Sequence, residues 1–297
     1  MSPSRNRQST PFNKLRASDR RPARARATRR RRPWLIELLE NRCLMSVSQV
    51  GGEFRVNTTT SATIEAGVAV AMDNAGDSVV VFASNSSGNY DIYFQRYNSA
   101  GVPQGSETKV NTTTAGDQRN PDVAMDDDGD FIVTWWFKDT TTSKYEIFAR
   151  RYTAAGAANG GEFRVNTTIS TAIRKNPRVA VDSTSDIVVF AWQSAESGTV
   201  DVYARRYNAL TNTFPDAADF RINATTTLIQ QDVDVAMNSD GTQVLFAWES
   251  DQVSSGSFDI YGRRYNASTG SFPATEFVVS NAANSQVNPA VSMDTVG

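Results

Sequence analysis

The chain has 297 residues, of which 39% are hydrophobic and 21% are charged, and its mean hydropathy is −0.42. That length fits two average domains or one large all-β domain, and no apolar run approaches the roughly 18 residues of a membrane-spanning helix. There is no histidine and only one cysteine, Cys43. This excludes His-dependent catalytic triads, histidine or cysteine zinc sites, and intramolecular disulfides.

The net charge of −2 hides two parts of opposite charge. Residues 1–45 hold 13 Lys and Arg against three acids, so the rest of the chain holds 17 bases against 29 acids. Residues 1–33 are rich in arginine and nearly empty of large apolar side chains, which predicts a disordered Arg-rich segment. An arginine cluster can bind phosphates, but the acidic body opposes this and no stacking aromatics are interleaved, so we expect no nucleic-acid partner.

Residues 34–46 follow the arginines and are predicted to form a short amphipathic sorting or export segment, because charged residues interrupt its apolar run. Within it, Leu39-Glu40-Asn41-Arg42-Cys43-Leu44-Met45-Ser46 resembles the L-E-x-R-x-L-L-S segment near the start of many large secreted or surface proteins of planctomycete bacteria. Met45 replaces the second leucine of that segment. The resemblance implies export and a secreted or cell-surface location; a twin-arginine signal is the alternative.

Residues 51–297 repeat with a period of about 55 residues. Arg-Tyr pairs recur in steps of 55, 55 and 58, and a Phe-Arg-Val-Asn-like motif and a Val-Ala-Met-Asp-like motif keep the same register. Each unit contains four β-rich segments separated by Gly, Asn, Asp and Ser clusters. The pairs are Arg96-Tyr97, Arg151-Tyr152, Arg206-Tyr207 and Arg264-Tyr265.

Four strands in this length match the size of a β-propeller blade. The expected fold class is therefore all-β, a propeller-like array of four repeats and a fragment, and we expect it to be incomplete at the C-terminus and to be an arc of a larger ring. The region resembles the propeller-like repeats of large secreted bacterial surface proteins. In the second unit we expect strands near 123–125, 131–135, 146–152 and 162–166, with a 136–144 loop between the second and third.

Tryptophans recur on the second strand of units two to four and are predicted to lie in the core. Small residues recur on the third strand of the same units, whereas unit one has Ala83 and Phe94. We expect each tryptophan to pack on a small residue across the hairpin, which would conserve volume. The expected contacts are Trp135 with Ala149, Trp192 with Ala204, Trp248 with Gly262, and Phe94 beside Ala83.

The Arg-Tyr pairs invite comparison with sialidases, which use an arginine cluster and a tyrosine nucleophile. Because the pairs recur in register, and an active site needs one asymmetric constellation, we interpret them as structural. The Asn-Thr-Thr triplets match the glycosylation sequon, but we interpret them as caps at strand ends.

Asp126, Asp128 and Asp130 form the turn richest in carboxylates and are candidate calcium ligands. The alternative is an ordinary hairpin turn, which also selects Asp and Gly. Apart from calcium, no cofactor is predicted.

Loops between the second and third strands vary most and emerge on one side, so we expect an interaction face there. The best candidates are Trp136, Phe137 and Lys138, joined by Arg174 and Lys175 of the next unit. The alternative is that Trp136 packs inward. We expect a non-catalytic secreted or cell-surface structural and adhesion-type module, whose partner is an extracellular polysaccharide or surface protein. The alternative is a carbohydrate-active propeller enzyme that uses carboxylates; the sequence does not fix the oligomeric state.

Overall fold

A computed structural model describes residues 52–58, 65–184, 186–254, 256–295 and 297. The predicted segments 1–33 and 34–46, with Cys43 and the planctomycete-type motif, lie outside these residues. All regular secondary structure in the described part is β. Among these residues no helix is long and apolar enough to cross a membrane.

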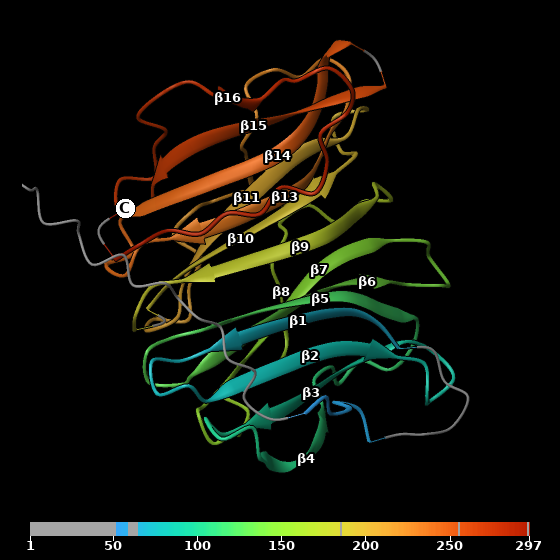
Figure 1. The fold of residues 1–297 in the computed structure, drawn as a ribbon. Coiled ribbons are helices and arrows are strands. Elements are labelled where there is room, and N and C mark those ends of the chain that lie inside the picture. Colours follow the sequence, from blue (N-terminus) through green and yellow to red (C-terminus); the bar gives the residue numbers. More distant parts are fainter. Residues whose placement is uncertain (1–51, 59–64, 185, 255, 296) are drawn as a thin grey trace, which may run out of the picture. The chain divides into compact units, whose positions relative to one another are not determined.

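In the described residues, sixteen strands form four antiparallel sheets of four strands, and each sheet follows chain order (Figure 1). This confirms the predicted all-β array of four-stranded repeats. Blade 1 comprises β1 (Glu65–Met72), β2 (Ser78–Ser84), β3 (Asp91–Tyr97) and β4 (Pro103–Lys109); blade 2, β5 (Asp117–Met125), β6 (Phe131–Lys138), β7 (Tyr145–Tyr152) and β8 (Phe163–Arg164); blade 3, β9 (Arg174–Val181), β10 (Ile187–Ser194), β11 (Asp201–Asn208) and β12 (Phe220–Arg221); blade 4, β13 (Gln230–Met237), β14 (Gln243–Ser254), β15 (Ser257–Asn266) and β16 (Phe277–Ser280).

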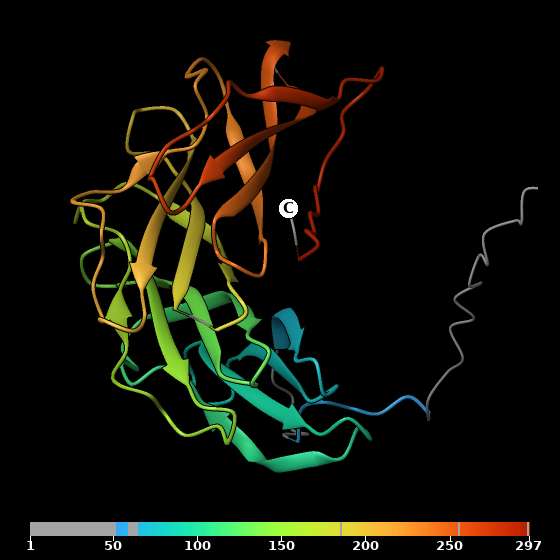
Figure 2. The same cartoon turned by 90° about the vertical axis from the view of Figure 1, so that its left-hand side faces the viewer.

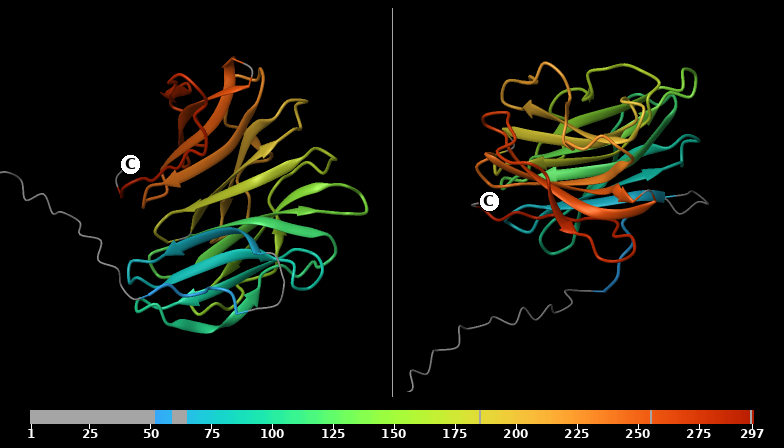
Figure 3. Two further views of the ribbon diagram at one scale, coloured as in Figure 1. Left: turned by 45° about the vertical axis from the view of Figure 1, so that its right-hand side comes forward. Right: turned by 90° about the horizontal axis from the view of Figure 1, so that it is seen from above.

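The first strand of each blade contacts the first strand of the next blade, in the order β1, β5, β9, β13. The blades therefore succeed one another around an axis lined by these inner strands, as Figure 2 and the two views of Figure 3 show. Three hydrophobic clusters each combine residues of two successive blades. The core of this array thus lies between sheets, which explains why the second strands are apolar on both faces.

The tryptophans Trp135, Trp192 and Trp248 are fully buried, as predicted. Their predicted partners are wrong by one residue, because each tryptophan lies opposite an aromatic residue of the third strand: Trp135 opposite Phe148, for example. Neighbouring residues of a strand point to opposite faces, so this shift places the small residue on the other face of the sheet.

The small residues of the third strand instead lie opposite a phenylalanine of the fourth strand. Ala149 pairs with Phe163, and Gly262 pairs with Phe277 so closely that a Cβ at Gly262 would lie 2.9 Å from the ring. In blade 1 the sizes are exchanged, since Phe94 lies opposite Thr108 and Ala83 lies opposite Ile92. Volume is therefore conserved between the third and fourth strands.

The phenylalanine of one blade contacts the tyrosine of the Arg-Tyr pair in the next blade. Phe163 stacks on Tyr207 and Phe220 on Tyr265, each with ring centroids 4.8 Å apart. Phe94 takes over this contact where Thr108 replaces phenylalanine, with its centroid 5.0 Å from that of Tyr152. These contacts fix the spacing of successive blades.

The arginines of the pairs also link blades, as the structural interpretation predicts. Arg96, Arg151 and Arg206 donate hydrogen bonds to backbone carbonyls of the following blade, at 2.5–2.6 Å. Asn111 and Asn166, from the Asn-Thr-Thr triplets, are buried and accept the backbone N–H groups of Ile92 and Ile147. The triplets thus cap strand ends.

Exchanging large and small residues in blade 2 tests this packing. Ala149→Phe should destabilise the chain by roughly 1–3 kcal/mol, because Phe163 already fills the space opposite. Adding Phe163→Thr copies blade 1 and should restore at least about 1 kcal/mol of the free energy of unfolding, a coupling expected of residues in contact. Urea denaturation of the variants measures both values, and purely additive effects would contradict the pairing.

Candidate functional site

Each inner strand is interrupted at the same place by a residue in the left-handed region of φ. The register with the second strand shifts there, for example between Arg119 and Asp122. Such β-bulges redirect side chains and are common beside active sites. Asn and Asp tolerate this conformation better than other residues with a side chain. The positions are Gly67, Asn120, Asn176 and Asp232, with φ between 47° and 56°, and Asn288, in the segment after blade 4, has a φ of 57°.

The bulge residues form a polar row across the inner strands. Asn120 donates through Nδ2 to Asn176 Oδ1 at 2.8 Å, and Asn176 donates through Nδ2 to Asp232 Oδ1 at 2.6 Å. Gln193 Oε1 on β10 accepts hydrogen bonds from Asn176 Nδ2 and from the backbone of Asp232. The row continues across three blades and presents amide and carboxylate groups along the axis.

Two residues after the bulge, three charged side chains occupy equivalent positions on β5, β9 and β13. They are Asp122, Arg178 and Asp234, and Arg178 Nε lies 3.7 Å from Asp234 Oδ1. Asp122 Oδ2 accepts the N–H of Val179 at 2.8 Å, and Asp234 Oδ2 accepts that of Val291 at the same distance. The side chains of Arg178 and Asp234 are 39% and 23% exposed, so both are accessible to solvent and to a ligand.

Asp122 is an unusual carboxyl group. Burial, helped by the negative charge of Asp234, raises its pKa to about 6, against the opposing effects of Arg178 and of the backbone N–H groups of Val179 and Val123. A carboxyl group with this pKa keeps its proton in mildly acidic solution and can donate it near neutral pH. The axis therefore holds a proton-donating carboxyl, a guanidinium and a second carboxylate.

This cluster does not repeat. The same position holds alanine in the first unit, Ala69, and in the fragment after blade 4, Ala290. It is therefore the asymmetric constellation that the Arg-Tyr pairs fail to provide. The cluster was not predicted from the sequence, although the residue before the valine of each Val-Ala-Met-Asp-like motif gives the series Ala, Asp, Arg, Asp, Ala.

The residues predicted for the interaction face lie together, but not on a loop. β6 continues to Lys138, so Trp136, Phe137 and Lys138 are strand residues, and Lys175 is the second residue of β9. The predicted 136–144 loop is shorter because an apolar aromatic run continues the strand. Lys175 Nζ lies 5.7 Å from the Trp136 ring centroid.

Trp136 and Arg174 are buried, with 7% and 0% exposure, so the alternative in which Trp136 packs inward agrees with its position. Arg174 replaces the glutamine that accepts the tryptophan indole N–H in blades 2 and 4. It pairs with Glu196 at 2.5 Å and donates to the carbonyl of Tyr145. Of the five predicted residues, only Phe137, Lys138 and Lys175 retain exposure.

The acidic turn of blade 2 is organised by its own backbone. Asp126 is buried, and its Oδ1 accepts the N–H groups of Asp128 and Asp130. Asp130 in turn accepts the N–H of Ala154. Across the described residues no group of three or more His, Cys, Asp or Glu side chains is placed to hold a metal ion. The calcium hypothesis thus rests on the sequence alone.

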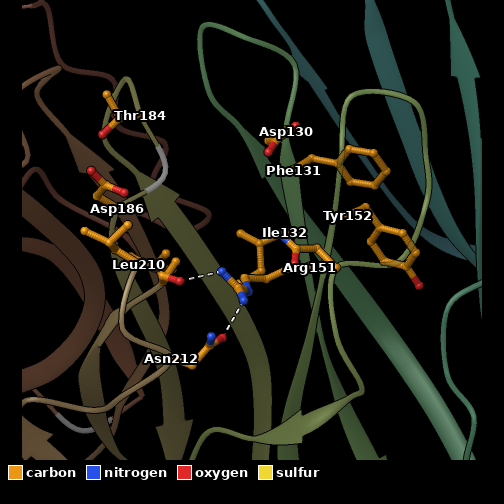
Figure 4. Close-up of a pocket in the computed structure, with 12 residues that line it drawn as sticks. Asp130, Phe131, Ile132, Arg151, Tyr152, Thr184, Asp186, Leu210 and Asn212 are labelled. Carbon is orange, nitrogen blue, oxygen red and sulfur yellow. Dashed lines mark hydrogen bonds between the residues drawn. The ribbon is translucent and has the colours of Figure 1, made fainter.

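A cavity of about 330 Å³ lies between blades 2 and 3, beside Arg151 and Asp186 (Figure 4). Arg151 donates there to the carbonyl of Ala209 and to Asn212 Oδ1. A smaller cavity of about 210 Å³ lies beside Arg206, the equivalent residue, between blades 3 and 4. A cavity thus recurs at the equivalent place between successive blades, so we interpret both cavities as gaps between blades. The candidate site is therefore the cluster of charged residues at the axis.

The fold is similar to the folds of solved glycosidases. A Hadza microbial sialidase is 12% identical over 78% of this chain and 48% of its own, with a TM-score of 0.50. An α-L-arabinofuranosidase of Fusarium graminearum, in complex with arabinobiose, is 10% identical over 71% of this chain and 65% of its own, with a TM-score of 0.54. An α-L-arabinanase of Penicillium chrysogenum, also with arabinobiose, is 15% identical over 77% of this chain and 70% of its own, with a TM-score of 0.53.

At these identities the similarity shows the fold, a β-propeller arrangement. The chain spans about half the length of the sialidase and 65% of that of the arabinofuranosidase. No protein-family model matches the chain, and no curated protein matches its sequence.

The predicted non-catalytic, adhesion-type module is contradicted, because the solved proteins that share this fold are glycosidases. The repetition of the Arg-Tyr pairs does not extend to every position of the repeat. Repeated residues build the scaffold, whereas the charged residues of the axis differ from blade to blade.

The raised pKa of Asp122 predicts a pH-dependent stability. Because the folded-state pKa of about 6 lies above the unfolded value, the contribution of this proton to stability is full below about pH 4 and is lost as the pH rises through 6. Asp122→Asn should therefore raise the melting temperature at pH 7.5, and the gain should vanish toward pH 4. Calorimetry over this range measures the difference.

Asp139→Asn is the matched control. Asp139 is partly buried, and hydrogen bonds from Thr142 and Thr141 lower the pKa of its carboxyl group. A carboxyl group with a lowered pKa stabilises the fold when it is ionised, so Asp139→Asn should lower, and not raise, the melting temperature at pH 7.5. A pH-independent effect of Asp122→Asn would show that Asp122 has an ordinary pKa.

Proposed function

We propose that this chain forms part of a carbohydrate-active β-propeller that hydrolyses glycosidic bonds at the axis of its inner strands. The observation that carries the proposal is the pair Asp122 and Asp234, two carboxyl groups in different environments beside Arg178. Glycoside hydrolysis generally needs two carboxyl groups, one protonated and one charged. The similarity of the fold to glycosidase propellers supports the assignment.

Asp122 is the proposed general acid. Its raised pKa lets it carry a proton that it gives to the oxygen of the leaving sugar. Its Oδ2 accepts the N–H of Val179 at 2.8 Å, which holds the carboxyl group in place. When the proton leaves, the positive charge of Arg178 offsets the new negative charge.

Asp234 is the proposed second carboxylate, acting on the anomeric carbon directly or through a water molecule. The guanidinium of Arg178 and the N–H of Val291 each hold one of its oxygens, which fixes the plane of the carboxylate. The positive charge that develops on the sugar ring during bond cleavage is stabilised by such a fixed carboxylate.

The row Asn120, Asn176 and Asp232 is proposed to bind sugar hydroxyl groups. Its amide and carboxylate groups lie within three residues of the acidic pair, and the bulge redirects them along the inner strands. Lys175 precedes Asn176 on β9, and its ammonium group lies over the ring of Trp136. The partner is thus an oligosaccharide or polysaccharide.

An extracellular location belongs to the same proposal. It is supported by the arginine-rich head and by the planctomycete-type segment at residues 39–46, both expectations from the sequence. A polysaccharide substrate outside the cell agrees with export.

Hydrolysis of synthetic glycosides tests the function. The full chain is screened on 4-nitrophenyl glycosides, including α-L-arabinofuranoside and a sialoside, and on arabinan. Asp122→Asn and Asp234→Asn should each lower kcat/KM by roughly 100-fold or more, since each removes a group that acts in the transition state. For a substrate with a good leaving group, Asp122→Asn should lose less activity, because such a group needs no proton.

Asp139→Asn and Asp240→Asn are controls, as both replace carboxylates outside the axial cluster whose pKa is lowered by hydrogen bonds from nearby threonines. They should leave kcat/KM unchanged. Activity that survives both axial substitutions, or a chain inactive on every glycoside and polysaccharide tested, would contradict the proposal.

A further inference from the structure

Two neighbouring inner strands each carry a cation immediately before the bulge residue. On β5 Arg119 precedes Asn120, and on β9 Lys175 precedes Asn176. Because the side chains of Asn120 and Asn176 are hydrogen-bonded at 2.8 Å, the two cations come from adjacent points of the two strands. Of the four described blades, only blades 2 and 3 are charged at this position. The equivalent residues of blades 1 and 4 are Ala66 and Gln231.

Each of these cations lies over a tyrosine of the preceding blade. Arg119 Cζ is 3.7 Å from the ring centroid of Tyr90, and Lys175 Nζ is 5.5 Å from that of Tyr145. The two tyrosines are equivalent, since Tyr90 immediately precedes β3 and Tyr145 is the first residue of β7. In blade 3 the equivalent residue is Val200, and the inner strand that follows it carries no cation at this position. Attraction between a cation and an aromatic face therefore holds both charged groups in place.

A third cation shares the ring of Tyr145. Lys138 on β6 is directly opposite Tyr145 in the strand pairing, and its Nζ lies 5.6 Å from the same ring centroid. Neither Lys138 nor Lys175 forms an ion pair with an acid in the described part of the chain. Two ammonium groups beside one ring repel each other, and a bound anion offsets that repulsion.

Arg119 is only partly neutralised by its acidic neighbour. Its Nη2 donates to Asp117 Oδ2 at 3.1 Å, and its side chain remains 36% exposed. A guanidinium has five N–H donors, so others remain after this bond. Such a group binds the oxygens of a carboxylate or a sulfate through charge-assisted hydrogen bonds.

We propose that Arg119, Lys138 and Lys175 form a subsite for the negatively charged groups of an acidic polysaccharide, either the carboxylates of uronic acids or sulfate esters. Asn120 and Asn176 follow two of the cations directly, and their amides both donate to and accept from hydroxyl groups. Hydroxyl groups beside acidic groups are the chemistry of a charged sugar polymer, which favours this ligand over an acidic peptide. The further step, that this polymer is the substrate of the axial cluster, rests on the proposed function.

Binding is measured by isothermal titration calorimetry with the full chain carrying Asp122→Asn, so that cleavage does not interfere. The probes are polygalacturonate, which carries carboxylates, dextran sulfate, which carries sulfates, and arabinan, which is neutral. We expect at least one acidic polymer to bind saturably and at least roughly tenfold more tightly than arabinan. This binding should weaken between about 0.05 M and about 0.5 M salt, because salt screens exposed charges. The tighter of the two acidic polymers identifies the anion.

A triple variant tests the three cations of the subsite, each replaced by glutamine. Binding of the acidic polymer should weaken at least roughly fivefold, since each exposed charge pair contributes a little. A control variant removes the same charge from the outermost strands β4, β8 and β12, where each cation already faces an acid, and should leave binding unchanged. The control substitutions are Lys109→Gln, Arg164→Gln and Arg221→Gln. Each single variant is measured as well, so the test does not depend on the folding of the triple variant.

Three results would overturn the subsite. They are equal affinity for arabinan and the acidic polymers, equal losses in the test and control variants, and binding of poly-L-glutamate as tight as that of the acidic polysaccharides, since the occupant would then be an acidic peptide. Hydrolysis separates this inference from the proposed function. A chain that binds polygalacturonate through the three cations but cleaves no glycoside keeps the subsite and loses the proposed activity. A chain that hydrolyses arabinan with a kcat/KM unaffected by the triple substitution keeps the activity and loses the acidic substrate.

Discussion

The stacking of a phenylalanine from one blade on a tyrosine of the next is the contact on which the rest of the structure depends. Phe163 on Tyr207 and Phe220 on Tyr265 repeat the same separation, and the arginine beside each tyrosine bonds to the following blade. Aromatic pairs of this kind stabilise beyond the area that they bury. With the outer parts of the blades held at one spacing, the inner strands are brought side by side along the axis.

Because the inner strands lie side by side, one position of the repeat can form a site from several blades. Equivalent residues of successive blades become neighbours, so Asp122, Arg178 and Asp234 interact although 56 residues separate each from the next. A repeat can keep its packing residues constant and vary a single position on the inner strand. The scaffold is then uniform and the chemistry is local, which is how function is generally placed on a stable fold.

Much of the fold follows from the sequence alone. The period, the four strands of a unit and the buried tryptophans could be predicted because packing between blades imposes the same residues in each repeat. The register of the second and third strands could not, because a shift of one residue leaves both apolar faces plausible when both are buried. The burial of Trp136 and Arg174 could not be predicted for a related reason, since neither residue type reveals whether its polar group has a buried partner.

The repeat pattern predicts the fold, but it does not predict the site, because the residues of the site differ from one repeat to the next. Asp122 is a single acid among many, and only its position beside Asp234 and Arg178 gives it a raised pKa. A carbon-13 NMR titration of the aspartate carboxyl carbons, with the Asp122 signal assigned by its loss in Asp122→Asn, measures this pKa directly. We expect a midpoint near 6, which falls when Asp234 is replaced by asparagine. A midpoint near the ordinary value of about 3.9 in both chains would contradict the role of Asp122.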